Sequence, residues 1–189
     1  MLRGKLYLAS DPELLAARIR ARRLCQRLSS ADPEARDERQ ALLASLLGAV
    51  GVGAEIESPF FCDYGAQITL GAGVFVNMNC VFLDCAAITL GAQTQLGPAV
   101  QLYTATHPLD AAARVAGPEL ARPISIGARV WIGGGTIVLP GVTIGDDTVV
   151  GAGSVVTRDL PPGVVAVGNP CRVVRSLAPV GSGELRSGG

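Results

Sequence analysis

The chain has 189 residues, enough for one domain with a substantial hydrophobic core. Hydrophobic side chains make up 49% of it and charged ones only 17%, a composition that is typical of globular proteins and excludes a disordered chain. Its sixteen basic and sixteen acidic residues cancel without a basic stripe, and no apolar run reaches eighteen residues, so we expect neither a nucleic acid partner nor a membrane span.

The chain start and the cysteines favour a cytoplasmic location. The first five residues contain no apolar core of a secretory signal peptide. The number of cysteines is odd and no two are spaced as CxxC, which is typical of reduced, mostly buried thiols. These residues are Cys25, Cys62, Cys80, Cys85 and Cys171.

Residues 1–50 are predicted to form a helical cap. Asp11-Pro12-Glu13 and Asp32-Pro33-Glu34 each combine the Asp of a helix N-cap with a Pro and a Glu in the first turn. Gly48 ends the second helix after a group of leucines. We expect this helix pair to cover the open base of the segment that follows. For Asp11, a helix cap and a contact with substrate both remain open.

From Ile126 onward an aliphatic residue recurs every six positions, usually followed by Gly, with a small residue four positions on. A period of six matches neither the 3.6-residue repeat of a helix nor the two-residue alternation of a strand. It is typical of a parallel β-helix, in which short strands form the faces of a prism and coils stack around an apolar core. The aliphatic positions are Ile126, Ile132, Val138, Ile144, Val150 and Val156, and the small ones are Val130, Thr136, Val142, Thr148 and Ser154.

An earlier block has the same period. Two extra residues around 84–87 shift its frame, after which the repeat resumes. With three hexads per coil, the two blocks predict roughly five coils. The fold is therefore expected to be mainly β, a left-handed parallel β-helix over residues 51–162. The earlier core series is Val52, Ser58, Tyr64, Leu70, Val76 and Phe82, and after the shift Leu90, Leu96 and Leu102.

Two further segments follow the repeat. Pro161-Pro162 is expected to close the last coil, with residues 163–177 as a closing segment. Residues 178–189 are rich in Gly and Ser and are expected to be a disordered tail.

The hexads stop between Leu102 and Ile124, and residues 103–123 are predicted to form a loop that protrudes from the prism. Long loops in a regular solenoid are usually functional. Near the start of this loop lies His107, the only histidine in the chain, beside Pro108. Histidine exchanges a proton near neutral pH, so His107 is the candidate general base, although a lone histidine is also often structural.

The histidine count excludes one class of enzyme and the chain length another. A zinc site built from three histidines, as in carbonic-anhydrase-like prisms, is impossible with one, and we expect no metal. Sugar nucleotidyltransferases with a hexapeptide tail need a large nucleotide-binding domain in front. The first fifty residues are too few for it.

Several motifs resemble those of the maltose O-acetyltransferase family, to which galactoside and nodulation-factor acetyltransferases also belong. The resemblance extends from Gly4 to about Leu177, and the His-Pro loop combined with the Trp-Ile-Gly coil is its specific part. The motifs are Cys62-Asp63-Tyr64-Gly65, the loop start 103–110, Val130-Trp131-Ile132-Gly133-Gly134, the coil 140–146 and Gly168-Asn169-Pro170-Cys171.

The resemblance implies transfer of an acetyl group from acetyl-CoA to a sugar hydroxyl, in a homotrimer whose active sites lie between neighbouring prisms. His107 matches the catalytic base, and the backbone N–H of Gly134 matches the donor that stabilises the tetrahedral oxyanion. The galactoside enzymes carry Ser at the Gly134 position, so only the amide is assigned here. Glu119, near the far end of the loop, is a candidate to orient His107.

Three residues match acceptor-contacting positions of the family: Asp63, Asn77 and Asp84. Carboxylates and amides suit sugar hydroxyls, but the same residue types also stabilise corner turns, and both interpretations remain open. Cys85 replaces a second Asp of the galactoside enzymes. This departure concerns the choice of acceptor rather than the chemistry.

The late coils are expected to bind CoA. Arginines suit its phosphates, and small residues leave room for the pantetheine arm. Solvated charge near the end of the chain is the alternative role of the arginines. The positions that match the family are Gly134, Ala152, Thr157, Arg158, Arg172 and Arg175.

Two other functions are alternatives to transfer to a sugar. A xenobiotic acetyltransferase, acting on an antibiotic hydroxyl, uses the same prism and a loop histidine, but the helix pair and the residues before His107 favour the sugar enzymes. A non-catalytic β-helical binding module has no need of a loop that carries His107.

Overall fold

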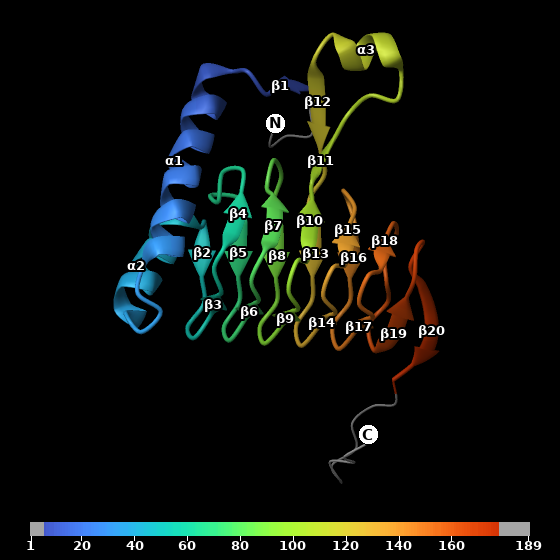
Figure 1. Ribbon diagram of the computed structural model, residues 1–189. Helices are drawn as coiled ribbons and strands as arrows, with labels where there is room; N and C mark the ends of the chain where they lie inside the picture. The colour runs from blue at the N-terminus through green and yellow to red at the C-terminus, as the bar shows by residue number, and fades with distance from the viewer. Residues whose placement is uncertain (1–5, 178–189) are drawn as a thin grey trace.

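The computed structural model describes residues 6–177, which coil into a prism of stacked strands with two helices at one end (Figure 1). None of the helices in this part of the chain is long and apolar enough to span a membrane. Short strands alternate with corner turns, as the six-residue period predicts. The mainly β, parallel β-helical fold with an N-terminal helical cap and a protruding loop is thereby confirmed.

The chain visits three sheets in turn, here called the first, second and third faces. All strands within them pair in parallel except β20. The first face consists of β2 (Ala49–Val50), β5 (Ile68–Leu70), β8 (Ile88–Leu90), β13 (Ile124–Ile126) and β16 (Thr143–Ile144). The second consists of β3 (Glu55–Ile56), β6 (Phe75–Val76), β9 (Gln95–Leu96), β14 (Trp131–Ile132), β17 (Val149–Val150), β19 (Val164–Val167) and β20 (Arg172–Ser176). The third consists of β4 (Phe60–Cys62), β7 (Cys80–Leu83), β10 (Gln101–Tyr103), β15 (Ile137–Val138) and β18 (Val155–Val156).

The late hexads form the core as predicted. All six aliphatic residues from Ile126 to Val156 are buried, and so are the small residues four positions after them. The buried hydroxyls among these small residues are satisfied by backbone carbonyls; Thr136, for example, donates to Gly133 at 2.7 Å. The glycines allow the coils to approach, because a Cβ built on Gly133 would lie 2.4 Å from the backbone nitrogen of Ala152.

The predicted frame of the first coil is wrong. Val52 is 90% exposed, and the core positions are instead Ile56, which is buried, and Val50, which packs against the core. The reason is a second corner with two extra residues, at 63–67, which shifts the frame in the same way as the corner at 84–87. From Leu70 onward the predicted positions are buried.

The helix pair covers the base of the prism. In α2 (Arg36–Leu46) the buried leucines Leu42, Leu43 and Leu46 belong to the same apolar core as the strands. In α1 (Pro12–Ser30) Asp11 is the N-cap and accepts a hydrogen bond from the Glu13 N–H at 2.9 Å. The second predicted N-cap is wrong: Asp32 accepts from the Glu34 N–H in a turn, and α2 begins four residues later at Arg36.

The segment that leaves the prism after β10 forms β11 (Ala105–Thr106), α3 (Ala111–Val115) and β12 (Pro118–Ala121), which stand clear of the coils in Figure 1. Strand β12 pairs with β11 and also with β1 (Tyr7–Leu8), so the N-terminal strand completes a small antiparallel sheet that the sequence did not predict. At the other end, β19 continues the second face within the predicted closing segment 163–177. The tail 178–189 lies outside the described residues.

Candidate active site

One corner of the prism, between the third and first faces, carries all three insertions into the regular repeat. We call it the loop corner. It consists of residues 63–67, residues 84–87 in the next coil and the loop 104–123 in the coil after that. Of the residues predicted to take part in function, the stacked coils bring Asp63, Asp84, His107 and Glu119 to this corner.

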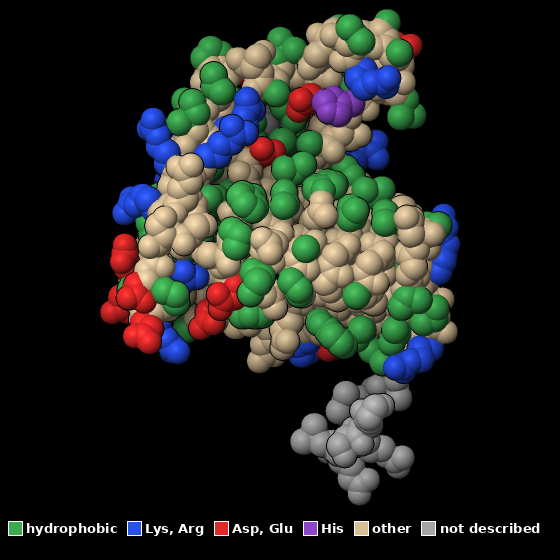
Figure 2. Space-filling model, in the orientation of Figure 1, with side chains coloured by type: hydrophobic (Ala, Val, Ile, Leu, Met, Phe, Trp, Pro, Cys, Tyr) green, Lys and Arg blue, Asp and Glu red, His purple; other side chains and the backbone are tan. Residues whose placement is uncertain are grey.

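His107 directly follows β11 and is exposed (the purple side chain in Figure 2). The backbone around it is fixed from both sides. Asp110 caps α3 by accepting from the Ala113 N–H at 2.8 Å, and Arg114 donates to the carbonyls of Pro108 and Leu109 at 3.1 Å each. The loop therefore presents the imidazole from an ordered turn.

Glu119 lies on β12 and does not hydrogen-bond with His107 within the described residues. Its Oε2 instead accepts a hydrogen bond from the Tyr7 hydroxyl at 2.8 Å. The pKa of Tyr7 is raised above its ordinary value, mainly by burial of the side chain. This hydroxyl therefore stays protonated and acts as the donor. The predicted orientation of His107 by Glu119 remains a proposal.

Cys85 is a buried thiol beneath the loop. Its Sγ donates to Asp63 Oδ2 at 3.5 Å, and burial raises its pKa to about 12. The group at the position of the second family Asp is therefore a neutral thiol at physiological pH, with neither the charge nor the acceptor strength of a carboxylate.

Asp84 is fully buried and serves the corner itself. Its carboxylate accepts from the backbone N–H of Tyr64 at 2.8 Å and of Gln67 at 3.3 Å. These bonds support the interpretation of Asp84 as a corner residue. Asp63 is half-buried, and Asn77 is half-buried with its Oδ1 accepting from the Met78 N–H at 2.8 Å.

The next corner, between the second and third faces, holds Asn77, Gly134 and Ala152 in different coils. The N–H of Gly134 donates to no acceptor within residues 6–177, whereas the N–H groups of Gly133 and Gly135 are both bonded to neighbouring coils. Gly134 thus offers a free backbone donor. His107 and Gly134 belong to different corners of one chain.

The predicted CoA contacts lie in the last coils. Thr157 and Arg158 follow β18, and Arg172 and Arg175 lie on β20. All four side chains are exposed. Within the described residues the one salt bridge joins Arg129 to Asp147, so these three arginines have no acidic partner there.

Sequence reasoning missed the part of the site that comes from the N-terminus. Tyr7 and the helix α1 pack with Tyr64 and Cys85 in a second apolar cluster beneath the loop. Arg18 of α1 donates to the Tyr64 hydroxyl at 2.9 Å. The only signal for this arrangement was the family resemblance of the segment before Asp11.

Comparison with known proteins adds two family models and close relatives. Residues 1–51 match the maltose acetyltransferase hexapeptide capping motif, and residues 123–158 match the bacterial transferase hexapeptide of six repeats. The chain is 53% identical to nodulation protein L of Rhizobium meliloti over 173 residues, which cover 92% of this chain and 94% of that protein.

Solved structures with the same fold include acetyltransferases in complex with acetyl coenzyme A or coenzyme A. A maltose O-acetyltransferase from Clostridium difficile is similar with a TM-score of 0.92 and 45% identity, over 94% of this chain and 95% of that one. A hexapeptide-repeat acetyltransferase of Vibrio cholerae in complex with acetyl coenzyme A has a TM-score of 0.89 and 40% identity, over 95% of this chain and 97% of that one. A galactoside acetyltransferase in complex with coenzyme A has a TM-score of 0.86 and 36% identity, over 93% of this chain and 88% of that one.

Proposed function

Because the chain belongs to the hexapeptide-repeat acetyltransferases of the maltose and galactoside O-acetyltransferase family, we propose that it transfers an acetyl group from acetyl-CoA to a hydroxyl of a small sugar or glycoside. The observation that carries this proposal is the exposed His107 on an ordered loop of a prism that is similar along its whole length to acetyl-CoA-bound and CoA-bound acetyltransferases. The cytoplasm, where thiols stay reduced, is the location we propose for an enzyme with five free cysteines.

In the proposed reaction His107 accepts the proton of the acceptor hydroxyl while its oxygen attacks the thioester carbonyl. The tetrahedral oxyanion then accepts a hydrogen bond from the N–H of Gly134, and such a contact is often worth roughly 3 kcal/mol. Collapse of the intermediate forms the ester and expels the CoA thiolate. The imidazolium of His107 returns the proton to that thiolate.

For the donor we propose that Arg158, Arg172 and Arg175 contact the phosphates of CoA, while Ala152 and Thr157 lie along its pantetheine arm. Their exposure and their lack of acidic partners within the described residues support this assignment. For the acceptor we propose Asp63 and Asp84 from the loop corner and Asn77 from the corner that holds Gly134; Asp63 and Asn77 are half-buried.

The active enzyme is proposed to be a homotrimer. His107 and Gly134 lie at different corners of one chain, so a site that uses both is most simply formed between two prisms. The outward row of the third face supports such contacts, because it is apolar at four of its five positions. In register order the row is Phe61, Val81, Gln101, Ile137 and Val155. Charged side chains are sparse over the face of the prism seen in Figure 2.

An acceptor screen tests the function. Purified enzyme with acetyl-CoA is offered maltose, glucose, a galactoside, an oligosaccharide of N-acetylglucosamine and, as the antibiotic alternative, chloramphenicol. Release of free thiol above the rate without acceptor, with an O-acetylated product in the mass spectrum, is the expected result for one or more of the sugars. Acetylation of chloramphenicol alone would favour a xenobiotic acetyltransferase, and turnover of none of the acceptors would contradict the proposal.

A further inference from the structure

The N-terminal strand brings a hydroxyl next to the loop that carries His107. Tyr7 and Glu119 are directly opposite each other in the antiparallel pair of β1 and β12, and the Tyr7 hydroxyl donates to Glu119 Oε2 at 2.8 Å. Within residues 6–177 the other carboxylate oxygen of Glu119, Oε1, has no hydrogen-bond partner. One oxygen of this carboxylate is thus fixed and the other is free.

The register of the neighbouring pair extends this row to the histidine. Strands β11 and β12 pair Ala105 with Ala121 and Thr106 with Leu120. Continued by one residue, the same register sets His107 opposite Glu119. Side chains that are directly opposite in an antiparallel pair lie on the same face of the sheet, with Cβ atoms about 5 Å apart. Tyr7 and Glu119 therefore share a row across β1 and β12, and His107, the residue directly after β11, is the next position in that register.

Apolar packing also fixes the position of the Tyr7 ring. The ring packs against the second apolar cluster, which contains Tyr64 and the buried Cys85, and the Cys85 thiol is in turn bonded to Asp63. The N-terminal strand is thereby fixed to the coil corners, and the hydroxyl has a defined position relative to β12.

We propose that Tyr7 is a positioning residue for His107, acting through Glu119. This inference rests on the proposed role of His107 as the base. With Oε2 held by Tyr7, Oε1 of Glu119 accepts the N–H of one ring nitrogen and leaves the other nitrogen basic, which fixes both the tautomer and the orientation of the ring. The proton of the acceptor hydroxyl then moves to the basic nitrogen, while Tyr7 keeps its own proton. Catalytic hydrogen bonds are often long before substrate binds, so the missing His107–Glu119 bond is compatible with this role.

The kinetic test compares Tyr7→Phe, Glu119→Ala and the double variant of the full chain. Phe keeps the packing and the strand pairing but removes the hydroxyl, so kcat should fall about tenfold while the KM for acetyl-CoA stays within about twofold. The double variant should be no slower than Glu119→Ala alone, because Tyr7 acts only through the carboxylate. If the two single losses of kcat multiply in the double variant, or if kcat is unchanged in Tyr7→Phe, the proposal is overturned.

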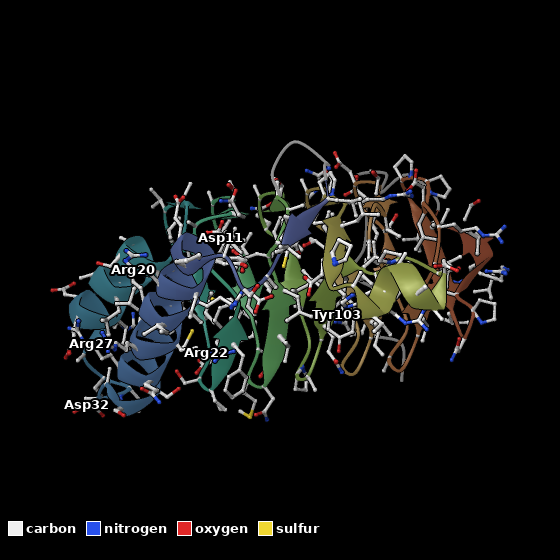
Figure 3. All side chains as sticks on the ribbon, turned by 90° about the horizontal axis from the view of Figure 1, so that it is seen from above. Asp11, Arg20, Arg22, Arg27, Asp32 and Tyr103 are labelled. Carbon is white, nitrogen blue, oxygen red and sulfur yellow. The ribbon has the colours of Figure 1, made fainter. Side chains whose placement is uncertain are left out.

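A second measurement does not depend on activity. Because His107 is the only histidine, protein labelled with ¹⁵N-histidine gives the ring signals of this residue alone. We expect one tautomer to dominate in the wild type and a shift toward a mixture in both Tyr7→Phe and Glu119→Ala. The matched control is Tyr103→Phe, which removes a hydroxyl that makes no hydrogen bond within the described residues (labelled in Figure 3) and should leave the spectrum and kcat unchanged.

The two proposals fail differently. If His107→Ala remains active while Tyr7→Phe alters the ring spectrum, the base assignment is wrong and the positioning contact stands. If His107→Ala is inactive while Tyr7→Phe leaves both kcat and the spectrum unchanged, the proposed function stands and the role of Tyr7 is refuted.

Discussion

The carboxylate of Asp84 and the backbone N–H of Tyr64 join two successive coils through a 2.8 Å hydrogen bond at the loop corner. Because Asp84 is fully buried, desolvation raises its pKa to about 6, although the backbone N–H groups of Tyr64, Gly65 and Gln67 act in the opposite direction. The corner beneath the loop is therefore held by a group that titrates near neutral pH.

Asp84 should make stability depend on pH. The folded state binds this proton more tightly than the unfolded chain, whose ordinary pKa is 3.8, so the stabilisation is complete below about pH 4 and is lost as the pH rises through 6. The free energy of unfolding of the wild type should therefore decrease between pH 4 and pH 7. In Asp84→Asn this decrease should be smaller than in the wild type, by roughly 3 kcal/mol at most. Urea unfolding at a fixed protein concentration measures it, with the exposed Asp159→Asn as control. The same pH dependence in wild type and Asp84→Asn would contradict the prediction.

The corrected frame of the first coil can be tested with one substitution at two sites. Val76 is fully buried and Val52 is 90% exposed. Val76→Ala should lower the free energy of unfolding by about 2 kcal/mol, through lost apolar burial and a residual cavity, while Val52→Ala should change it by less than about 0.5 kcal/mol. Equal effects in denaturant titrations would show that Val52 is part of the core after all.

His107→Ala should abolish acetyl transfer. Loss of a general base typically costs two to four orders of magnitude in rate, here without loss of folding or CoA affinity because the side chain is exposed. Turnover by thiol release and CoA binding by calorimetry are the measurements. Leu109→Ala, at a 97% exposed position of the same loop, is the control and should retain activity. Turnover of His107→Ala within tenfold of wild type would rule out its role as base.

Neutralising Arg158, Arg172 or Arg175 should raise the KM for acetyl-CoA about ten- to a hundredfold, because one charged hydrogen bond is worth about 1.5–3 kcal/mol. The KM for sugar and kcat should change much less, since these contacts are remote from the reacting carbon. Arg27→Gln is the control, because Arg27 lies on α1 at the opposite end of the prism (Figure 3).

Dephospho-CoA identifies which arginine contacts the 3′-phosphate. The wild type should lose affinity for it, and the variant that lacks that contact should lose less. If wild type and all three variants lose affinity equally, none of these arginines binds that phosphate, and the placement of CoA along the last coils is wrong.

The trimer has its own test. Light scattering coupled to gel filtration should give three times the chain mass of 19.4 kDa, and activity should fall when the protein is diluted to the point of dissociation. A monomer with full activity would contradict a site shared between prisms.

The sequence predicted those features that depend on local spacing. The burial of Ile126, Ile132 and Val138 follows from a repeat in which each coil has the same length, and the Asp11 cap follows from the chemistry of a helix start. The prediction of the frame in the first coil was wrong because the composition of residues 63–67, which include the two extra residues, does not differ from that of an ordinary corner.

Long-range partners could not be predicted. Tyr7 and Glu119 are 112 positions apart and meet through a strand of two residues, too short for any periodic signal. His107 could be singled out because it is unique and lies in the loop. The site that we propose it shares with Gly134 would need contacts between chains, which no spacing within one chain encodes.

The loop 104–123 leaves the prism and returns to it without disturbing the stack. Its two ends are joined by the Arg122 N–H donating to the Thr104 carbonyl at 2.9 Å, and β13 then pairs Ile124 with Ile88 in the register of the regular coil. The stability of the prism and the chemistry at its corner are therefore largely separable. If the proposed acceptor site lies at this corner, an exchange of the loop for one of another length or sequence would change the acceptor while the coils keep their pairing, and a new substrate would need no new fold.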